Sequence, residues 1–334
     1  MLHRKTVLHL ALQGGGAHGA LTWGVLDRLL DEPGLEFGRI SGASAGALNG
    51  AALATGLARG GRQAAKDNLA LLWRQVAEAG LMMTLLNAPF KKPTLGLWDD
   101  TAPLLSPYQT SPMALETLRY VLTGVADAEV LRRAAPTPLF VNAVHVNTGV
   151  SRVFGPDDMS IEALMASACA PFMFPAVRID GQSYWDGTYG ANPMLWPLYR
   201  GSGSADILLV ELAPVLREET PTTAKNILSR INEIASARGL VEELRALQAV
   251  NRDSPGASIR MHVLSLPDAL ETPDMEPSLK RTVDAFLFET LRRKGHAACD
   301  AWLGANAGAI GERASVDIGA RYLQPFSRPG AAGG

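Results

Sequence analysis

Cysteine is scarce in this chain, neither sign of charge is in excess, and apolar runs are short. Of the 334 residues only Cys169 and Cys299 are cysteines, and neither has the Cys/His spacing of zinc sites, so neither a disulfide framework nor a metal site is predicted. The 31 basic and 33 acidic residues leave a net charge of −2, which gives no reason to expect nucleic acid as a partner. No apolar run approaches the roughly 18 residues that a membrane-spanning helix needs, so none is expected.

The N-terminal residues imitate a secretion signal only in part. A basic start, His3-Arg4-Lys5, is followed by a short apolar run that His9 interrupts, and glycines stand where a cleavage site would be expected. The sequence therefore predicts a first strand over residues 6–12. It also predicts a cytoplasmic protein, with peripheral association with a membrane left open.

Apolar residues and glycine are abundant. With 47% apolar and 19% charged residues, the chain is able to bury a large core. The run over 6–12 ends in three glycines, as a buried strand entering a tight turn does, and an amphipathic helix is expected over 17–31. A second strand near 37–40 leads into a helix over 45–58. This alternation predicts an α/β fold with a mainly parallel sheet.

The rest of the chain supplies further strands and helices. Helices are expected over 67–79, 113–122, 126–134, 161–168, 227–247, 279–291 and 296–304, and strands or hairpins over 139–146, 151–154, 177–185, 207–212 and 259–264. The sequence divides into a core over 1–215, a mainly helical part over 216–322 that packs on it, and a tail over 323–334 that we expect to be disordered.

Residues 81–112 are apolar but have no sustained period, and five prolines interrupt them. We expect a long covering loop there. The alternative is a lid, or a contact with a bilayer through Phe90, Leu97 and Trp98.

Gly42-Ala43-Ser44-Ala45-Gly46 matches the pattern G-x-S-x-G. A strand directly before it and a helix directly after it are the arrangement that a nucleophile elbow requires. Such a turn crowds neighbouring backbones, and the small residues Gly42 and Gly46 fit beside the serine. Ser44 is therefore a candidate nucleophile at a helix N-terminus, where N–H groups favour developing negative charge. The alternative is a purely structural N-cap.

A second glycine-rich turn, Gly14-Gly15-Gly16-Ala17-His18-Gly19, also satisfies the dinucleotide-binding pattern G-x-G-x-x-G. That function needs an acidic residue near the end of the next strand, but that strand ends in Gly42-Ala43-Ser44 and Glu36 precedes it. A glycine-rich turn at a helix N-terminus instead offers several N–H donors that point one way. This is what an oxyanion hole requires.

Asp186-Gly187 follows the strand expected to end at Trp185. Asp-Gly by itself is a turn signal. At the end of a strand, however, the aspartate side chain is presented at the edge of the sheet. Since a serine nucleophile needs a group that accepts its proton, Asp186 is the candidate base.

Together these three elements resemble the patatin-like phospholipases. The segment 166–175, ASACAPFMFP, is similar to that family's alanine- and serine-rich stretch and its P-x-x-F-P signature. The resemblance covers residues 6–212. It implies a three-layer α/β/α patatin-like core and a lipid acyl hydrolase, a phospholipase A or lipid esterase, that acts through a Ser–Asp dyad without histidine and without a metal or organic cofactor.

By that resemblance, Ser44 attacks an ester carbonyl, Asp186 takes its proton, and an acyl-serine forms. The oxyanion donors implied by the family are the N–H groups of the loop Gly14, Gly15, Gly16 and Ala17. His18, Gly19, Gly42, Gly46 and Gly187 would support these motifs. Two positions depart from the family pattern, because His18 stands where arginine or lysine is usual and Thr188 where glycine or alanine is usual.

Two other functions stay open on the sequence alone. An α/β-hydrolase triad in the order Ser44, Asp186 and a histidine would need His262 or His296, since both follow Asp186. A non-catalytic lipid-binding protein of the same fold is the second alternative. The expected partner is in each case a lipid or acyl ester; the sequence does not specify the oligomeric state.

Overall fold

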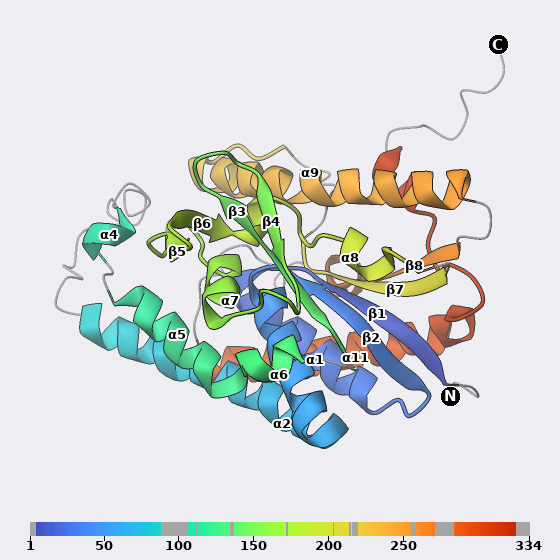
Figure 1. The fold of residues 1–334 in the computed structure, drawn as a ribbon, viewed down its shortest axis with the longest axis horizontal. Helices are drawn as coiled ribbons and strands as arrows, with labels where there is room; N and C mark the ends of the chain where they lie inside the picture. Colours follow the sequence, from blue (N-terminus) through green and yellow to red (C-terminus); the bar gives the residue numbers. More distant parts are fainter. Residues whose placement is uncertain are drawn as a thin grey trace, which may run out of the picture.

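A computed structural model describes residues 5–87, 106–110, 113–133, 137–171, 173–202, 204–213, 215, 220–254, 258–270 and 284–324. Within them, eight strands form one sheet in the order β5-β6-β3-β2-β1-β7-β8, with β4 paired to β3 (Figure 1). The strands are β1 (Thr6–Leu12), β2 (Leu35–Gly42), β3 (Leu139–His145), β4 (Ser151–Phe154), β5 (Val177–Ile179), β6 (Gln182–Asp186), β7 (Ser204–Glu211) and β8 (Ser258–Ser265). The strands β3, β2, β1, β7 and β8 are parallel, whereas β4 and β6 pair antiparallel with β3, and β5 with β6.

The helices flank this sheet. They are α1 (Gly19–Leu30), α2 (Ala45–Asn87), α4 (Pro107–Thr110), α5 (Ala114–Val125), α6 (Ala128–Arg132), α7 (Ile161–Ser167), α8 (Trp196–Tyr199), α9 (Ala224–Asp253), α10 (Leu266–Ala269) and α11 (Ala285–Asn306). Shorter helical turns are η1 (Gly16–His18), η4 (Gly187–Tyr189), η7 (Ala307–Ala309) and η8 (Gly319–Leu323).

The central strands are buried on both faces, and this produces three layers. In β1, Leu8, Leu10 and Leu12 pack in the core formed with α1, α2 and α11, while Ala11 packs in the core formed with α8 and α9. Figure 1 shows α1, α2 and α11 below the sheet and α8 and α9 above it. Parallel strands covered by helices on both sides have this pattern of burial. The predicted three-layer α/β/α fold is confirmed.

The helix α2 joins two predicted helices, 45–58 and 67–79, through a kink at Gly60 and Gly61. It also continues to residue 87, so the prediction of a loop from residue 81 is wrong for 81–87. The prolines behind that prediction begin only at Pro89, and no proline stands between residues 45 and 88. The short helix α4 likewise replaces loop at 107–110. The remaining residues of the predicted covering loop, 88–105 and 111–112, lie outside the described residues, as do 325–334 of the tail.

The part beyond residue 215 contributes to the sheet as well as to the helical layers. The strand β8 pairs in parallel with β7 along its whole length. The two helices predicted over 279–291 and 296–304 form the single helix α11, which packs along α1. Gly295 falls at this crossing, where a Cβ atom would lie 2.1 Å from the Leu21 carbonyl oxygen. The division of the chain at residue 215 stays a prediction.

The crossing of α1 and α11 predicts a steric cost for any side chain at Gly24. A Cβ atom there would lie 1.9 Å from the Arg292 carbonyl oxygen. We expect Gly24→Ala to lower the free energy of unfolding by about 1–3 kcal/mol or more, because backbone atoms of two helices must move apart. Urea unfolding measures this.

The matched control is Gly304→Ala, on the exposed side of α11, where an added Cβ atom meets nothing within 4 Å. That variant should gain up to about 1 kcal/mol from helix propensity. Equal effects of the two substitutions would contradict the close helix packing.

Candidate active site

The turn between β2 and α2 holds Ser44 in a backbone conformation that is rare for residues with a side chain. Ser44 has φ = +54°, and its side chain is partly buried. The following helix passes so close to β1 that a Cβ atom at Gly46 would lie 2.1 Å from the Leu12 carbonyl oxygen. The Ser44 N–H donates to the Ser167 carbonyl at 3.1 Å. This strained turn, with glycine at position 46 where the helix touches β1, is the geometry of a nucleophile elbow.

Three segments that are distant in the sequence meet at Gly14. A Cβ atom there would lie 2.6 Å from the Ser44 Cβ and 2.6 Å from the Thr188 Cγ2. The glycine-rich turn after β1, the elbow after β2 and the turn after β6 are therefore in direct contact. The strands β1 and β2 are parallel neighbours with Leu12 opposite Gly42, which sets their two turns side by side.

Asp186 lies at the end of β6 and is only 2% exposed. Its Oδ1 accepts hydrogen bonds from the Thr188 N–H at 2.9 Å and the Thr188 hydroxyl at 2.8 Å. The Ser44 side chain lies close enough to this carboxylate to lower its pKa. The Asp186 N–H donates to the Cys169 carbonyl at 3.0 Å, which ties the strand end to the segment after α7.

Burial controls the protonation of this carboxyl group. Loss of hydration raises the pKa of Asp186 to about 6, and the interactions with Thr188 and Ser44 oppose the rise only in part. A carboxylate with such a pKa is a stronger base than an ordinary aspartate and is still ionised at neutral pH.

The glycine-rich turn supplies backbone donors beside Ser44. The Gly14 N–H already donates to the Asn192 Oδ1 at 2.6 Å, so it is occupied and does not serve as an oxyanion donor in this arrangement. Gly15, Gly16 and Ala17 begin the helical run η1–α1, and the first N–H groups of a helix have no acceptor within it. Gly15 is partly buried and Gly16 is exposed, so neither is closed off from solvent.

The sequence analysis missed the polar side chains that hold these turns together. Asn192 also donates from its Nδ2 to the Gly14 carbonyl at 3.2 Å, so its amide pairs with both backbone groups of that residue. The Gln13 Oε1 accepts from the N–H groups of Leu212 and Ala213 at 2.9 and 3.0 Å. The Asn142 Nδ2 donates to the Gly187 carbonyl at 2.7 Å. Their partners lie up to 200 residues away along the chain, so no local pattern marks them.

The loop-supporting residues are buried beneath the site. His18 has no exposed surface, which favours a role inside the loop over one as a solvated charge. A Cβ atom at Gly19 would lie 2.7 Å from the Ala45 Cβ, so this glycine allows α1 and α2 to begin close together.

The two histidines that a triad could use, His262 and His296, have other neighbours. The His262 Nε2 lies 3.0 Å from the Asp206 Oδ1, its Nδ1 lies 3.1 Å from the Ser315 Oγ, and the ring is fully buried. The nearest acidic partner of His296 is Asp31, at 3.9 Å. Neither ring is bonded to Ser44 or Asp186 in this structure, which counts against the triad.

Cys169 and Cys299 are both free and buried. Burial raises the pKa of the Cys169 and Cys299 thiols to about 12, so neither is a nucleophile near neutral pH. The residues that the structure describes contain no group of three or more His, Cys, Asp or Glu side chains arranged to hold a metal ion. Among those same residues, no helix combines the length and apolar character needed to cross a membrane.

Comparison with known proteins identifies the family. The sequence profile described as patatin-like phospholipase matches residues 10–199. No curated protein sequence matches the chain. Among solved structures, VipD from Legionella pneumophila is 15% identical, with 90% of this chain and 67% of VipD covered and a TM-score of 0.42. The type III effector ExoU is 16% identical, with 89% and 53% covered and a TM-score of 0.35. The chain therefore spans about two thirds of VipD and about half of ExoU.

The fold and the matched sequence profile define the class of protein: a three-layer α/β/α protein of the patatin-like type. The matched residues make up more than half of the chain and include Ser44 and Asp186. The chain belongs to the patatin-like phospholipase family.

The raised pKa of Asp186 predicts a pH-dependent cost to stability. A carboxyl group whose pKa is higher in the folded than in the unfolded protein favours folding when protonated. This contribution is complete below about pH 4 and is lost as the pH rises through about 6. We therefore expect Asp186→Asn to be more stable than the wild type by about 2–3 kcal/mol at pH 8, with the difference fading toward pH 4.

Urea unfolding at several pH values measures the difference. The matched control is Asp180→Asn, at the exposed tip of the same hairpin, with a side chain 80% exposed. It should change stability little at any pH. A difference for Asp186→Asn that stays constant with pH would show that its burial does not shift its pKa.

Proposed function

We propose that the protein is a serine acyl hydrolase that cleaves carboxylic ester bonds of lipids through a Ser44–Asp186 dyad. One observation carries the proposal: the turn that holds Ser44 and the turn that follows the buried Asp186 meet at Gly14, beside the backbone donors that begin η1. Membership of the patatin-like phospholipase family supports a lipid ester as the substrate.

In the first step, the Ser44 Oγ bonds to the ester carbonyl carbon while its proton passes to Asp186. The electron pair of the carbonyl moves to its oxygen, and the N–H groups of Gly15, Gly16 and Ala17 hold this oxyanion. When the intermediate collapses, the bond to the alcohol oxygen breaks and that oxygen takes the proton from Asp186. The acyl group stays on Ser44.

In the second step, water loses a proton to Asp186 and attacks the acyl-serine. The oxyanion forms in the same place, and its collapse releases the fatty acid. The departing Ser44 Oγ takes the proton back from Asp186. The residues then have the same protonation states as at the start.

A carboxylate is a weak base toward a serine hydroxyl, so the dyad relies on two further effects. The burial that raises the pKa of Asp186 to about 6 brings the base closer to the working pH. Each fixed oxyanion donor contributes roughly 3 kcal/mol in other hydrolases. Both effects act where the glycine-rich turn, the turn at Ser44 and the turn after Asp186 meet at Gly14.

Removal of either dyad side chain should slow ester hydrolysis strongly. We expect Ser44→Ala to lower kcat/KM on p-nitrophenyl esters by about a thousandfold or more, and Asp186→Asn by about a hundredfold or more. Defined phospholipids run beside an ester chain-length series identify the preferred substrate class. Asp180→Asn should retain wild-type kinetics. Wild-type turnover in both dyad variants would show that the reaction occurs elsewhere.

The pH profile should report the base directly. Because Asp186 must be ionised to accept a proton, kcat/KM should fall about tenfold per pH unit below a pKa of about 6. Thr188→Val removes the hydroxyl that donates to Asp186, so the acidic limb should move upward, by up to about one unit. A limb that does not move in this variant would mean that a different group titrates.

A further inference from the structure

The two halves of α9 present different side chains to solvent. In the C-terminal half, Leu240, Leu244 and Leu247 are fully buried in the core beneath the helix. At 100° per residue the opposite, outward side of this half carries Glu242, Arg245 and Arg252. This is an ordinary amphipathic surface helix.

The N-terminal half is apolar on that same outward side. Ile227, Leu228, Ile231 and Ile234 are 42%, 37%, 57% and 52% exposed. They lie with Ala224, Ala235 and Arg238 in roughly one third of the helix circumference. We call these seven residues the α9 patch. The only acidic side chain of this half, Glu233, faces the protein interior and is 5% exposed.

The α9 patch adjoins the turn that carries the candidate base. The Tyr189 hydroxyl donates to the Asn232 Oδ1 at 3.5 Å, and Tyr189 is the last residue of η4, which directly follows Asp186. Two turns further along α9, a Cβ atom at Gly239 would lie 1.9 Å from the Gly190 carbonyl oxygen, so the helix rests on this segment.

Two aromatic side chains and an arginine extend the surface on the same side of the sheet. Tyr189 and Trp185 are 37% and 36% exposed. Arg178 pairs with Ser183 across the β5–β6 hairpin and therefore shares a face with Trp185, two residues on. Gly190 lies over this same face of the sheet. A Cβ atom at Gly190 would lie 3.1 Å from the Val144 Cγ2, and Val144 is the cross-strand partner of Trp185.

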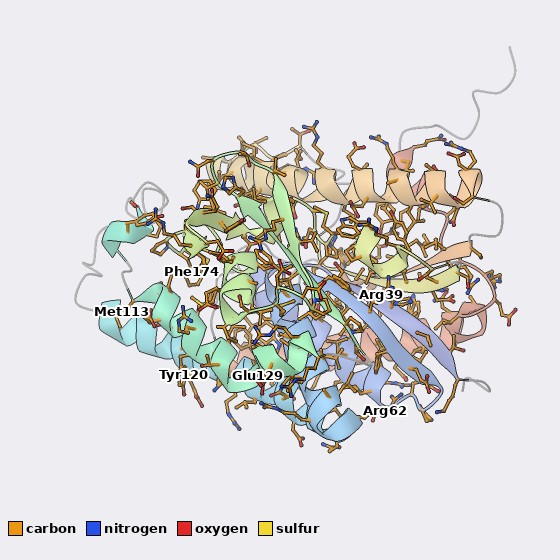
Figure 2. All side chains as sticks on the ribbon, in the orientation of Figure 1. Arg39, Arg62, Met113, Tyr120, Glu129 and Phe174 are labelled. Atoms are coloured by element: carbon orange, nitrogen blue, oxygen red, sulfur yellow. The ribbon has the colours of Figure 1, made fainter. Side chains whose placement is uncertain are left out.

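The composition of this surface fits a phospholipid bilayer. Aliphatic side chains enter the boundary between headgroups and acyl chains, and Trp and Tyr prefer that same depth. Arg178 and Arg238 are both exposed, and their guanidinium groups complement lipid phosphates, while the α9 patch offers no carboxylate to repel them. Two of the other exposed apolar side chains, Met113 just before α5 and Tyr120 within it, lie away from α9 (Figure 2).

We propose that the α9 patch, with Tyr189 and Trp185, is the surface by which the protein rests on a phospholipid bilayer. The proposal rests on the lipid hydrolysis proposed above for its purpose, but its binding test does not depend on activity. Seated in this way, the bilayer adjoins the turn that holds Asp186. A lipid then reaches the site without first entering water.

The test compares the double variant Ile227→Ser/Ile231→Ser with Phe286→Ser. Phe286 is 78% exposed on α11, in the layer on the other side of the sheet, and serves as the matched control. Binding to phosphatidylcholine vesicles that contain phosphatidylglycerol is measured by co-sedimentation, in a Ser44→Ala background so that the lipid is not consumed. We expect the double variant to bind at least about tenfold more weakly, since each inserted isoleucine contributes roughly a tenfold factor. Phe286→Ser should bind as the parent does.

Activity with Ser44 intact gives a second readout. The double variant should hydrolyse vesicle lipid at least about tenfold more slowly and keep its kcat/KM on a short soluble ester. Quenching of Trp185 by brominated lipid, taken as the difference from a Trp185→Phe variant, reports contact without altering α9. An absence of ester hydrolysis in the wild type would remove the proposed function and leave the binding result to decide this proposal.

Three results would overturn the proposal. The first is unchanged vesicle binding in the double variant, and the second is brominated lipid that leaves Trp185 unquenched. The third is a parent protein that sediments as a dimer which the double variant loses, because the α9 patch would then bind a second copy of the chain.

Discussion

Asp186 is a carboxyl group inside the protein, and hydrogen bonds from Thr188 replace only part of the hydration it loses. Burial of such a group is unfavourable for folding unless it is protonated or bonded. The surrounding structure keeps it in place: its backbone is tied to Cys169, and the following residue is held by Asn142. In the proposed reaction, Ser44 and the candidate oxyanion donors act together with Asp186. They can do so only if this carboxylate stays in place.

The mixed sheet explains how distant segments reach one place. Parallel strands β1 and β2 deliver the glycine-rich turn and the elbow to the same edge, because turns that follow neighbouring parallel strands lie together. The antiparallel strand β6 brings Asp186 to that edge from a later part of the chain. Contact at Gly14 then leaves no room for a side chain between them. The helix α9 rests on the segment that follows Asp186, so the proposed lipid surface lies next to the turn that carries the candidate base.

Local chemistry made the fold and the positions of three turns of the candidate site predictable. Strand–turn–helix order located the turns at Gly14 and Ser44. Gly46 lies where an added Cβ atom would be 2.1 Å from the Leu12 carbonyl oxygen of β1. Sequence could not reveal Asn192 or Gln13, because each pairs with backbone groups roughly 180–200 residues away and amide side chains have no spacing rule. The length of α2 could not be predicted from 81–87, because the apolar residues there have no helical period although the helix continues through them. His262 looked available for a triad until its bonds to Asp206 and Ser315 were known.

Those bonds also define the sharpest test of the central claim. Ser315, His262 and Asp206 form a second array of hydroxyl, imidazole and carboxylate, so a serine-directed reagent has two candidate targets in this chain. The measurement is treatment with a long-chain alkyl fluorophosphonate followed by mass spectrometry of the peptides. The account predicts one adduct per chain, on Ser44, with labelling that slows strongly in Asp186→Asn. An adduct on Ser315, or labelling of Ser44 at an undiminished rate without the Asp186 carboxylate, would contradict it.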